Sequence, residues 1–393
     1  MSEESNNYLN WSFQKIHKFR KTVLNWYDQE GRDLPWRKSK NPYHIWVSEI
    51  MLQQTQVNTV LPYYERFITE LPTIEDLSVC PEEKLHQLWQ GLGYYSRVRN
   101  MQSAAKQIMT DYDGIMPSNM KDLLSLKGIG PYTAAAIGSI AFGLVEPAID
   151  GNLMRITARL FEVEEDISQA KNRIVFKEIL DRLIDPERPG DFNQALMDIG
   201  ATIMTPNNYR PENHILKDFD QSYQNHTSHL YPVKRKKTKQ IEQGWLAFVI
   251  QNEKGEILMR QHQTGELLVG LWHYPLVAFD LLSLKEASEA RDAFVYTYLK
   301  HDQLVAESLT DQFRQYFIPQ IDNLKATVKH VFSHRIWQVM IVPVNLKDSG
   351  YQLLEQLHVT DTSFQWVAKD EIEQLALSSL QVKLFDLANK VIR

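Results

Sequence analysis

The spacing of apolar residues divides the chain into two parts of different texture. Between residues 12 and 220, apolar positions recur every three or four residues. In "FQKIHKFRKTVLNWY" they fall on one helical face, at Phe13, Ile16, Phe19, Val23 and Leu24. Beyond residue 241, short apolar runs alternate with turn residues such as those of "NEKGE", which is typical of strands. We therefore predict an all-α first domain followed by an α+β second domain.

The same pattern predicts where the elements lie. Gly, Pro and Asn separate helices that we expect over residues 13–27, 41–67, 80–93, 97–112, 119–127, 131–143, 152–161, 170–184 and 191–204. In the second domain we expect two strands within 244–262, further strands within 271–277, 325–344 and 363–368, and helices over 284–300 and 371–392. Residues 221–240 carry no periodic stripe and are predicted to be a linker. The predicted domains are therefore 1–220 and 241–393.

Length and composition agree with this division. A chain of 393 residues is too long for one ordinary core, and 43% hydrophobic with 23% charged residues indicates a globular protein. No apolar run approaches the roughly 20 residues of a membrane span, and "MSEESNNYLN" has no apolar signal core. The one cysteine, Cys80, excludes an internal disulfide and any four-cysteine metal site. We expect a soluble cytoplasmic protein without a membrane partner.

The net charge of −6 does not by itself indicate a nucleic-acid-binding protein. The one strongly basic stretch is the predicted linker, with Lys234, Arg235, Lys236, Lys237 and Lys239 and no acidic residue between 221 and 240. Such a run is either a solvated linker or a set of phosphate contacts. Any binding of DNA must therefore depend on local charge and backbone dipoles.

The most informative segment is "LLSLKGIGPYTAAAIGSIAF". A helix leads into Gly128-Ile129-Gly130, and a second helix begins at Pro131. The N–H groups at that helix start could hold a DNA phosphate, although an ordinary helix–turn–helix corner has the same form. The full pattern resembles the helix–hairpin–helix of base-excision DNA glycosylases.

Two carboxylates accompany this hairpin. Asp150 precedes a helix in "PAIDGNLMRITARL", where it is either an N-cap, an ionised carboxylate that stabilises a cationic transition state, or both. Glu49 lies on a largely apolar helix face, between Ile45 and Leu52. It is either a locally paired side chain or a desolvated general acid with a raised pKa. Carboxylates with oppositely tuned pKa values would form an acid and a stabiliser.

Five segments resemble, in order, signatures of the MutY family of adenine DNA glycosylases: "LPWRKSKNPYHIWVSEIMLQQTQVNTVLPYYERF", "WQGLGYYSRVRNM", "GIGPYTAAAIGSIAF", "IDGNLMRITARL" and "FNQALMDIGA". The resemblance implies that Glu49 protonates adenine N7, that Asp150 stabilises the sugar cation, and that Asn152 is its neighbour. It also implies an adenine pocket made by Arg32, Leu34, Trp36, Arg37 and Gln194. Residues that probe or wedge into the duplex would be Gln54, Thr55, Leu92 and Tyr94, with Gly128 and Gly130 on the hairpin. Backbone carbonyls of Leu124, Leu126 and Ile129 resemble a structural cation site.

Tyr132 bears on the type of glycosylase. It lies 18 positions before Asp150, where bifunctional relatives of the endonuclease III type carry a lysine that attacks the sugar. Tyrosine cannot form that Schiff base, and simple helix-start packing would exclude it equally. Lys127 is five residues away and could form an adventitious one. We therefore expect a monofunctional enzyme that leaves an abasic site.

The second domain resembles the Nudix-like module of the same family. "GELLVGLWHYPLV" is similar to its G-x-W-x-x-P turn, whereas "KEASEARDAF" lacks the R-E-x-x-E-E helix that a metal-dependent Nudix hydrolase needs. The "F-S-H" loop implies that Phe332, Ser333 and His334 contact 8-oxoguanine; from the residues alone it could be a β-turn with a structural histidine.

These features lead to a specific expectation. The chain should be a monomeric glycosylase that binds duplex DNA, flips out adenine opposite 8-oxoguanine or guanine, and removes it. Its rivals are a glycosylase for mismatched thymine or oxidised pyrimidines, a non-catalytic lesion binder, and a Nudix-like nucleotide-binding protein.

The stretch "MTPNNYRPENHILKDFD" follows the "MDIGA" helix. Most relatives carry there a [4Fe–4S] cluster with the ligand spacing C-x6-C-x2-C-x5-C. In this chain those positions are Met204, Pro211, His214 and Asp220, none of which is a thiolate. We therefore predict no cluster and no required cofactor, with packing of Tyr209, Ile215, Leu216 and Phe219 in its place.

Overall fold

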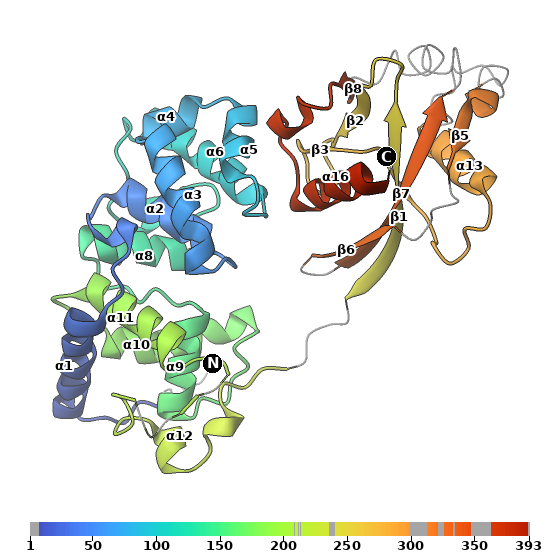
Figure 1. Ribbon diagram of the computed structural model, residues 1–393. Helices are drawn as coiled ribbons and strands as arrows, with labels where there is room; N and C mark the ends of the chain where they lie inside the picture. The colour runs from blue at the N-terminus through green and yellow to red at the C-terminus, as the bar shows by residue number, and fades with distance from the viewer. Residues whose placement is uncertain are drawn as a thin grey trace, which may run out of the picture. The chain divides into compact units, whose positions relative to one another are not determined.

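The computed structural model describes residues 8–207, 209–210, 212, 214–235, 240–298, 313–320, 326–332, 335–346 and 363–391. Contacts divide the chain into two compact units, one made of Met1–Cys80 with Ser96–Lys237 and the other of Pro81–Tyr95 with Thr238–Arg393. The first unit is helical, and the second is built around a β-sheet (Figure 1).

The helices of the first unit follow the predicted apolar stripes closely. They are α1 (Phe13–Glu30), η1 (Pro35–Arg37), α2 (Pro42–Leu52), α3 (Val57–Glu70), α4 (Ile74–Val79), α6 (Ser96–Asp111), α7 (Met120–Ser125), α8 (Pro131–Phe142), α9 (Gly151–Phe161), η2 (Ala170–Asn172), α10 (Arg173–Leu183), α11 (Pro189–Thr202), α12 (Gln221–Gln224) and η4 (Ser228–Leu230). Side-chain caps fix several starts: Ser12 caps α1, Asn41 caps α2, and Thr73 with Asp76 forms a capping box on α4.

The helix predicted over 41–67 is wrong as a single element, because the chain turns at residues 53–56. Gln54 has a φ of 59°, in the left-handed region, so the helix cannot continue through it. Arg97 of α6 stabilises this break. Its Nη1 donates to the carbonyl oxygens of Ile50, Met51 and Gln53 at 2.8, 3.2 and 2.6 Å. A cation thus satisfies the last carbonyls of α2.

The hairpin between α7 and α8 has the predicted form. Gly128 has a φ of +78°, and a Cβ there would lie 2.7 Å from Cβ of Asn100, so only glycine fits. Gly130 is the N-cap of α8, and Pro131 is its first residue. A Cβ on Gly130 would meet nothing within 4 Å, so the backbone at the start of α8 faces open space.

The core of the first unit joins α1, α9, α10 and α11. Trp11, Phe19, Phe161, Phe192 and Phe219 form a connected set of ring contacts at its centre, with ring centroids 4.6 to 6.1 Å apart. Phe219 contacts Trp11 and Phe19, so the loop after α11 contributes an aromatic side chain to this core.

The linker predicted over 221–240 is wrong for residues 221–235, because side chains and backbone fasten them to the helical unit. The N–H of Ile167 donates to the carbonyl of Val233 at 3.1 Å, and Nε of Arg159 donates to the carbonyl of Tyr231 at 3.2 Å. Arg235 donates its N–H to Asp166 at 3.3 Å. These are backbone contacts that no apolar pattern reveals. Lys236, Lys237 and Lys239 lie outside the described residues.

The second unit contains α5 (Glu82–Trp89) and a mixed sheet. Its strands are β1 (Ile241–Gln251), β2 (Ile257–Gln261), β3 (Trp272–His273), β4 (Leu276–Ala278), β5 (Phe317–Pro319), β6 (Thr327–Val331), β7 (Arg335–Leu346) and β8 (Phe364–Val367). The sheet order is β3-β2-β1-β7-β5, with β4 on β1, β6 on β7 and β8 on β2. The strands β1 and β7 are parallel, with Leu246 opposite Met340.

Alternation along β1 gives the sheet two apolar faces. Leu246, Phe248 and Ile250 pack in one core with α13 (Ala287–Tyr298), whereas Ala247 and Val249 pack in the other with α16 (Ser379–Val391). The short η5 (Ile372–Gln374) precedes α16. The predicted α+β class is therefore confirmed for this unit. Within the described ranges, no helix combines the length and apolar character required to cross a bilayer.

Candidate active site

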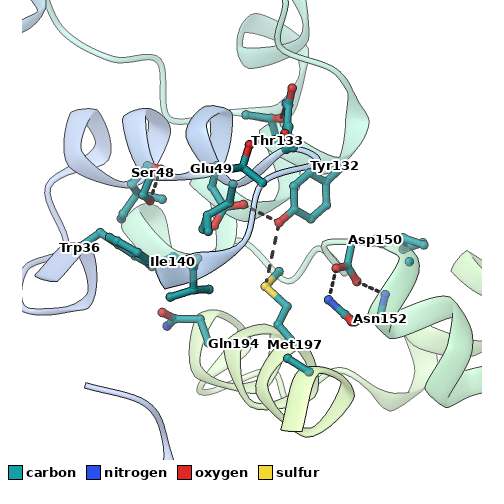
Figure 2. Close-up of a pocket in the computed structure, with 18 of the residues that line it drawn as sticks. Trp36, Ser48, Glu49, Tyr132, Thr133, Ile140, Asp150, Asn152, Gln194 and Met197 are labelled. Atoms are coloured by element: carbon teal, nitrogen blue, oxygen red, sulfur yellow. Dashed lines mark hydrogen bonds between the residues drawn. The ribbon is translucent and has the colours of Figure 1, made fainter. Parts of the chain in front are cut away.

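A cavity of about 660 Å³ lies within the helical unit, beside the hairpin. Its wall brings together residues from η1, α2, the turn after α2, the hairpin, α8, the start of α9 and α11 (Figure 2). The structure gathers here all four proposed catalytic residues, all five pocket residues and four of the proposed DNA contacts: Glu49, Tyr132, Asp150, Asn152, Arg32, Leu34, Trp36, Arg37, Gln194, Gln54, Thr55, Gly128 and Gly130.

Glu49 is almost completely buried on α2, with 5% of its surface exposed. The pKa of its carboxyl is raised to about 7, mainly because burial disfavours the charged form. The charge of Asp150 also raises this pKa, whereas the hydrogen bond from Tyr132 and the charge of Arg37 lower it. The side chain points toward Tyr132 across the cavity, as Figure 2 shows. Glu49 can therefore hold a proton near neutral pH, as a general acid must.

Asp150 is the N-cap of α9 and also lines the cavity. Its Oδ1 accepts the N–H groups of Asn152 and Leu153, both at 2.8 Å, and its Oδ2 accepts Nδ2 of Asn152 at 2.6 Å. Asp150 is thus both the N-cap of α9 and a residue of the cavity wall. The expectation of oppositely tuned pKa values is wrong, because burial raises the pKa of Asp150 as well, against the opposing effect of these N–H donors.

The hydrogen bonds nevertheless distinguish the two carboxyls. Asp150 accepts three N–H donors over both oxygens, which stabilise the carboxylate, whereas Glu49 accepts only the O–H of Tyr132. The two buried groups also repel one another when both are charged. These hydrogen bonds favour the arrangement in which Glu49 holds the proton and Asp150 the negative charge.

Tyr132 is the second residue of α8, and its hydroxyl donates to Oε2 of Glu49. Burial raises the pKa of the phenol well above its usual value, with the charges of Glu49 and Asp150 acting in the same direction. The hydroxyl thus stays protonated. This hydrogen bond fixes the orientation of the Glu49 carboxyl, a contact that the sequence did not indicate.

Three further residues, which the sequence did not single out, hydrogen-bond to residues of the cavity wall or to the segments that carry them. On α11, Asp198 binds Arg32 and Arg37, and Asn193 binds the segment that leads to Asp150: its Oδ1 accepts the N–H of Ala148 at 3.0 Å, and its Nδ2 donates to the carbonyl of Glu146 at 2.9 Å. Both side chains are fully buried, on the same helix as the predicted pocket residue Gln194. Nothing in the sequence indicated this, because polar residues also occur at exposed positions of the same helix.

Arg155 is the third. Its Nη2 donates to Oδ1 of Asn152 and to the carbonyl of Gly200, both at 2.7 Å. Its Nε donates to the carbonyl of Met204 at 2.8 Å. A continuous set of hydrogen bonds therefore runs from Asp150 through Asn152 and Arg155 to the loop after α11.

Of the four positions in that loop that the family resemblance aligns with cluster ligands, the structure describes three: Met204, His214 and Asp220. Pro211 lies outside the described residues. Met204 is fully buried in the core. His214 and Asp220 are buried and meet at Tyr209, whose hydroxyl lies 2.8 Å from Nε2 of His214 and donates to Oδ2 of Asp220. No group of three or more His, Cys, Asp or Glu side chains suited to a metal ion occurs among the described residues.

The remaining predicted residues lie elsewhere. Leu126 and Ile129 are buried on the hairpin, where the carbonyl of Leu126 accepts the N–H of Ile129 at 3.1 Å; Leu124 is exposed. Leu92 is buried and Tyr94 exposed in the 81–95 segment of the other unit. There too, the ring of Phe332 packs against Trp337, with centroids 4.9 Å apart. Ser333 and His334 lie outside the described residues.

Comparisons with known proteins agree with both halves of the chain. Residues 47–182 match the HhH-GPD superfamily of base excision DNA repair proteins, and residues 246–387 match the NUDIX domain. An adenine DNA glycosylase of Buchnera aphidicola subsp. Baizongia pistaciae is 39% identical over 259 residues, which are 65% of this chain and 71% of that protein.

A rat adenine DNA glycosylase is 44% identical over 200 residues, 49% of this chain and 39% of the rat protein. The chain thus spans about two fifths of the length of its mammalian relatives. Among solved structures, that of a thermostable thymine-DNA glycosylase is similar, with a TM-score of 0.50 and 28% identity over 54% of this chain and 98% of that one.

Proposed function

Because the chain belongs to the family of adenine DNA glycosylases, we propose that it binds duplex DNA and hydrolyses the bond between a flipped adenine and its deoxyribose. The observation that carries this proposal is the pair of buried carboxyls, Glu49 and Asp150, in one cavity beside the hairpin. A base inside a duplex cannot reach such a cavity, so the adenine must leave the stack first.

The chemistry follows from where the proton lies. Glu49 donates its proton to N7 of adenine, which makes the base a neutral leaving group. As the glycosidic bond lengthens, positive charge develops on the sugar, and the carboxylate of Asp150 stabilises it. Tyr132 holds Glu49 in place, and water completes the hydrolysis. No lysine takes the position of Tyr132, so we propose that the product is an intact strand with an abasic site.

We propose from the family pattern that the hairpin carbonyls of Leu124, Leu126 and Ile129 hold a cation, although the carbonyl of Leu126 also accepts the N–H of Ile129 at 3.1 Å. Such an ion would steady the hairpin against DNA phosphates and takes no part in the steps above.

The partner base is a finer part of the proposal. We propose that adenine opposite 8-oxoguanine, and opposite guanine, is the substrate, with the Phe332–His334 loop as the contact for the damaged base. Phe332 supports this through its position at the end of the β6 hairpin, where the described ring packs on Trp337.

An excision assay tests the proposal directly. Duplexes with A·8-oxoG, A·G and T·G pairs are incubated with excess protein, and strand breaks are scored with and without alkali. We expect adenine release from the first two, with breaks only after alkali. Release of thymine alone would support the mismatch-glycosylase alternative, and binding without release the lesion-binder alternative.

The raised pKa of Glu49 predicts a pH dependence for wild-type protein. Below a pH of about 7 the carboxyl is protonated and can act; above it the carboxyl ionises, so the single-turnover rate of adenine release should fall about tenfold per pH unit. DNA binding measured over the same range is the control. A rate that stays flat or rises between pH 6 and 9 while the duplex remains bound would contradict the assignment of Glu49 as the acid.

We also infer that the loop after α11 is held by hydrogen bonds and packing in place of an iron–sulfur cluster. Nδ1 of His214 accepts the N–H of Leu216 at 3.0 Å, so its proton lies on Nε2, which donates to Tyr209. Tyr209 in turn donates to Asp220. These hydrogen bonds form a non-covalent crosslink through Tyr209 between His214 and Asp220, two of the positions that the resemblance aligns with cluster ligands. From the sequence, Tyr209 was expected only to pack in the loop.

Electrostatics and packing reinforce the crosslink. Burial alone would raise the pKa of Asp220, but hydrogen bonds from His214, Tyr209 and Ser222 outweigh it and lower that pKa, so the carboxylate stays ionised. The guanidinium of Arg159 lies 3.9 Å from the Tyr209 ring centroid. Leu216 and Phe219 pack into the core below. Purified protein should accordingly be colourless and free of stoichiometric iron; absorbance of a [4Fe–4S] cluster would refute the inference.

Tyr209→Phe is expected to destabilise the protein by about 1–3 kcal/mol, because Asp220 loses a buried donor and His214 an acceptor. Thermal or denaturant unfolding measures this, with Tyr223→Phe as the matched control, since the Tyr223 hydroxyl makes no hydrogen bond within the described part of the chain. Equal stability of the two variants would show that the crosslink contributes nothing.

A further inference from the structure

Asp198 is a fully buried carboxylate on α11 that binds two arginines of the cavity wall at once. Oδ2 accepts Nη1 of Arg37 at 2.7 Å and the N–H of Arg32 at 3.0 Å. Oδ1 accepts Nη2 of Arg37 at 2.8 Å and Nε of Arg32 at 2.7 Å. The pair with Arg37 is bidentate, so Asp198 fixes both the position and the plane of that guanidinium.

The contacts of Asp198 also fix the backbone of the segment from Arg32 to Arg37, which forms part of the pocket. Nη1 of Arg37 also donates to the carbonyl of Arg32 at 3.2 Å, which closes the short stretch between the two arginines around Asp198. Leu34 and Trp36, two further pocket residues, lie within this stretch. A single carboxylate, 166 residues after Arg32 and 161 after Arg37, therefore sets the shape of one cavity wall.

Arg37 matters because its charge reaches Glu49. The charged and titratable groups that act on Glu49 are Tyr132 on α8, Asp150 before α9 and Arg37 in η1. The helix α11 presents the neutral Gln194, Met197 and Ala201 to the cavity, and the two further cations in its lining, Arg32 and Arg173, are not among the groups that shift the pKa of Glu49. Of the groups that do shift it, Arg37 is the one cation, and a nearby cation favours loss of the proton from a carboxyl. An unbalanced Arg37 would therefore oppose the role of Glu49 as an acid.

Asp198 supplies the balancing charge. Burial would disfavour its ionised form, but hydrogen bonds and charge from Arg37, and then hydrogen bonds from Arg32, outweigh burial and lower its pKa. It is thus an anion whenever Glu49 is acting. Arg37 is only 11% exposed, so solvent screens it little and the bound carboxylate is its main counter-charge.

We propose that Asp198 is a positioning residue for base excision: it holds Arg32 and Arg37 in the wall of the adenine pocket and offsets the charge of Arg37, so that Glu49 keeps its proton. This proposal rests on the proposed glycosylase activity. It assigns Asp198 no contact with the substrate; its effect passes through Arg37.

The test is the pH profile of single-turnover excision from an A·8-oxoG duplex for wild type, Asp198→Asn and Asp191→Asn. Asp191 is the matched control, since it lies on the same helix and pairs with Arg188 at 2.8 Å, and it is not among the groups that shift the pKa of Glu49. In Asp198→Asn the unbalanced Arg37 favours the ionised form of Glu49. The alkaline limb should therefore move to lower pH by about one unit, which is about a tenfold lower rate above neutrality. Asp191→Asn should follow wild type.

A merely structural role would lower the rate by the same factor at every pH, and that result would overturn the proposal. If Asp198→Asn does not fold, Arg37→Gln gives the complementary measurement, because it removes the cation while Arg32 still pairs with Asp198. Its alkaline limb should move to higher pH, and an unshifted limb would equally overturn the proposal. Wild-type protein that releases no adenine would instead refute the proposed function, so the two failures are distinguishable.

Discussion

Glu49→Gln is expected to lower the single-turnover rate of adenine release by at least about a thousandfold, while an A·8-oxoG duplex is still bound. Glutamine has nearly the same shape and can accept the hydrogen bond from Tyr132, but it has no proton to donate to N7. The loss should persist at every pH, because the titrating group itself is gone.

The measurement is product formation with protein in excess over DNA, together with a binding titration of the same duplex. Glu65→Gln is the control, since Glu65 is an exposed glutamate on the next helix, α3. Loss of both binding and excision in Glu49→Gln would indicate that Glu49 shapes the cavity. Full excision in this variant would remove Glu49 from the mechanism.

Asp150→Asn is expected to reduce excision by about a thousandfold with little loss of stability. Asparagine is as good an N-cap as aspartate, so the hydrogen bonds from the N–H groups of Asn152 and Leu153 can remain. What disappears is the negative charge that stabilises the sugar cation, together with the acceptor for Nδ2 of Asn152, because an amide nitrogen in place of Oδ2 cannot accept a hydrogen bond. This variant therefore separates the two functions that coincide at this position.

Asp150→Ala completes the comparison. It should lose excision to the same extent and also lose about 0.5–2 kcal/mol of stability, because the cap is removed as well. Thermal unfolding and single-turnover kinetics of both variants give the two quantities. If Asp150→Asn excises adenine at the wild-type rate, the carboxylate serves only as a helix cap.

Most of the architecture could be predicted from local pattern. Apolar spacing located most helices of the first unit to within a few residues, because each of these helices buries one apolar face. The short helices α4 and α12 were not predicted. Glycine and proline located the hairpin for an equally local reason, since Gly128 needs a positive φ and Pro131 suits a helix start. The two longer errors, at residues 53–56 and 221–235, fell where contacts between distant segments override the local pattern.

The chain of hydrogen bonds from Asp150 to the loop after α11 could not be predicted in this way. Arg155 and Arg159 occur in a helix whose apolar stripe is clear, and nothing local shows that both donate to the carbonyl of Met204. That carbonyl belongs to one of the positions that the family resemblance aligns with cluster ligands. In this chain, two arginines of α9 and the Tyr209 crosslink fasten the same loop.

The sequence by itself therefore determined which chemistry is present: two carboxyls in the order and context of a glycosylase, a tyrosine where a lysine would cleave the strand, and no cysteines for a cluster. Only the tertiary structure decided the pKa of Glu49 and which buried residues hold the residues of the cavity in place. The pKa of Glu49 depends on burial, on Tyr132 and on Arg37, and Arg37 depends on Asp198, 161 residues away. Electrostatic effects act through space and rise as water is excluded, so they follow from the fold and cannot be obtained from the order of residues alone.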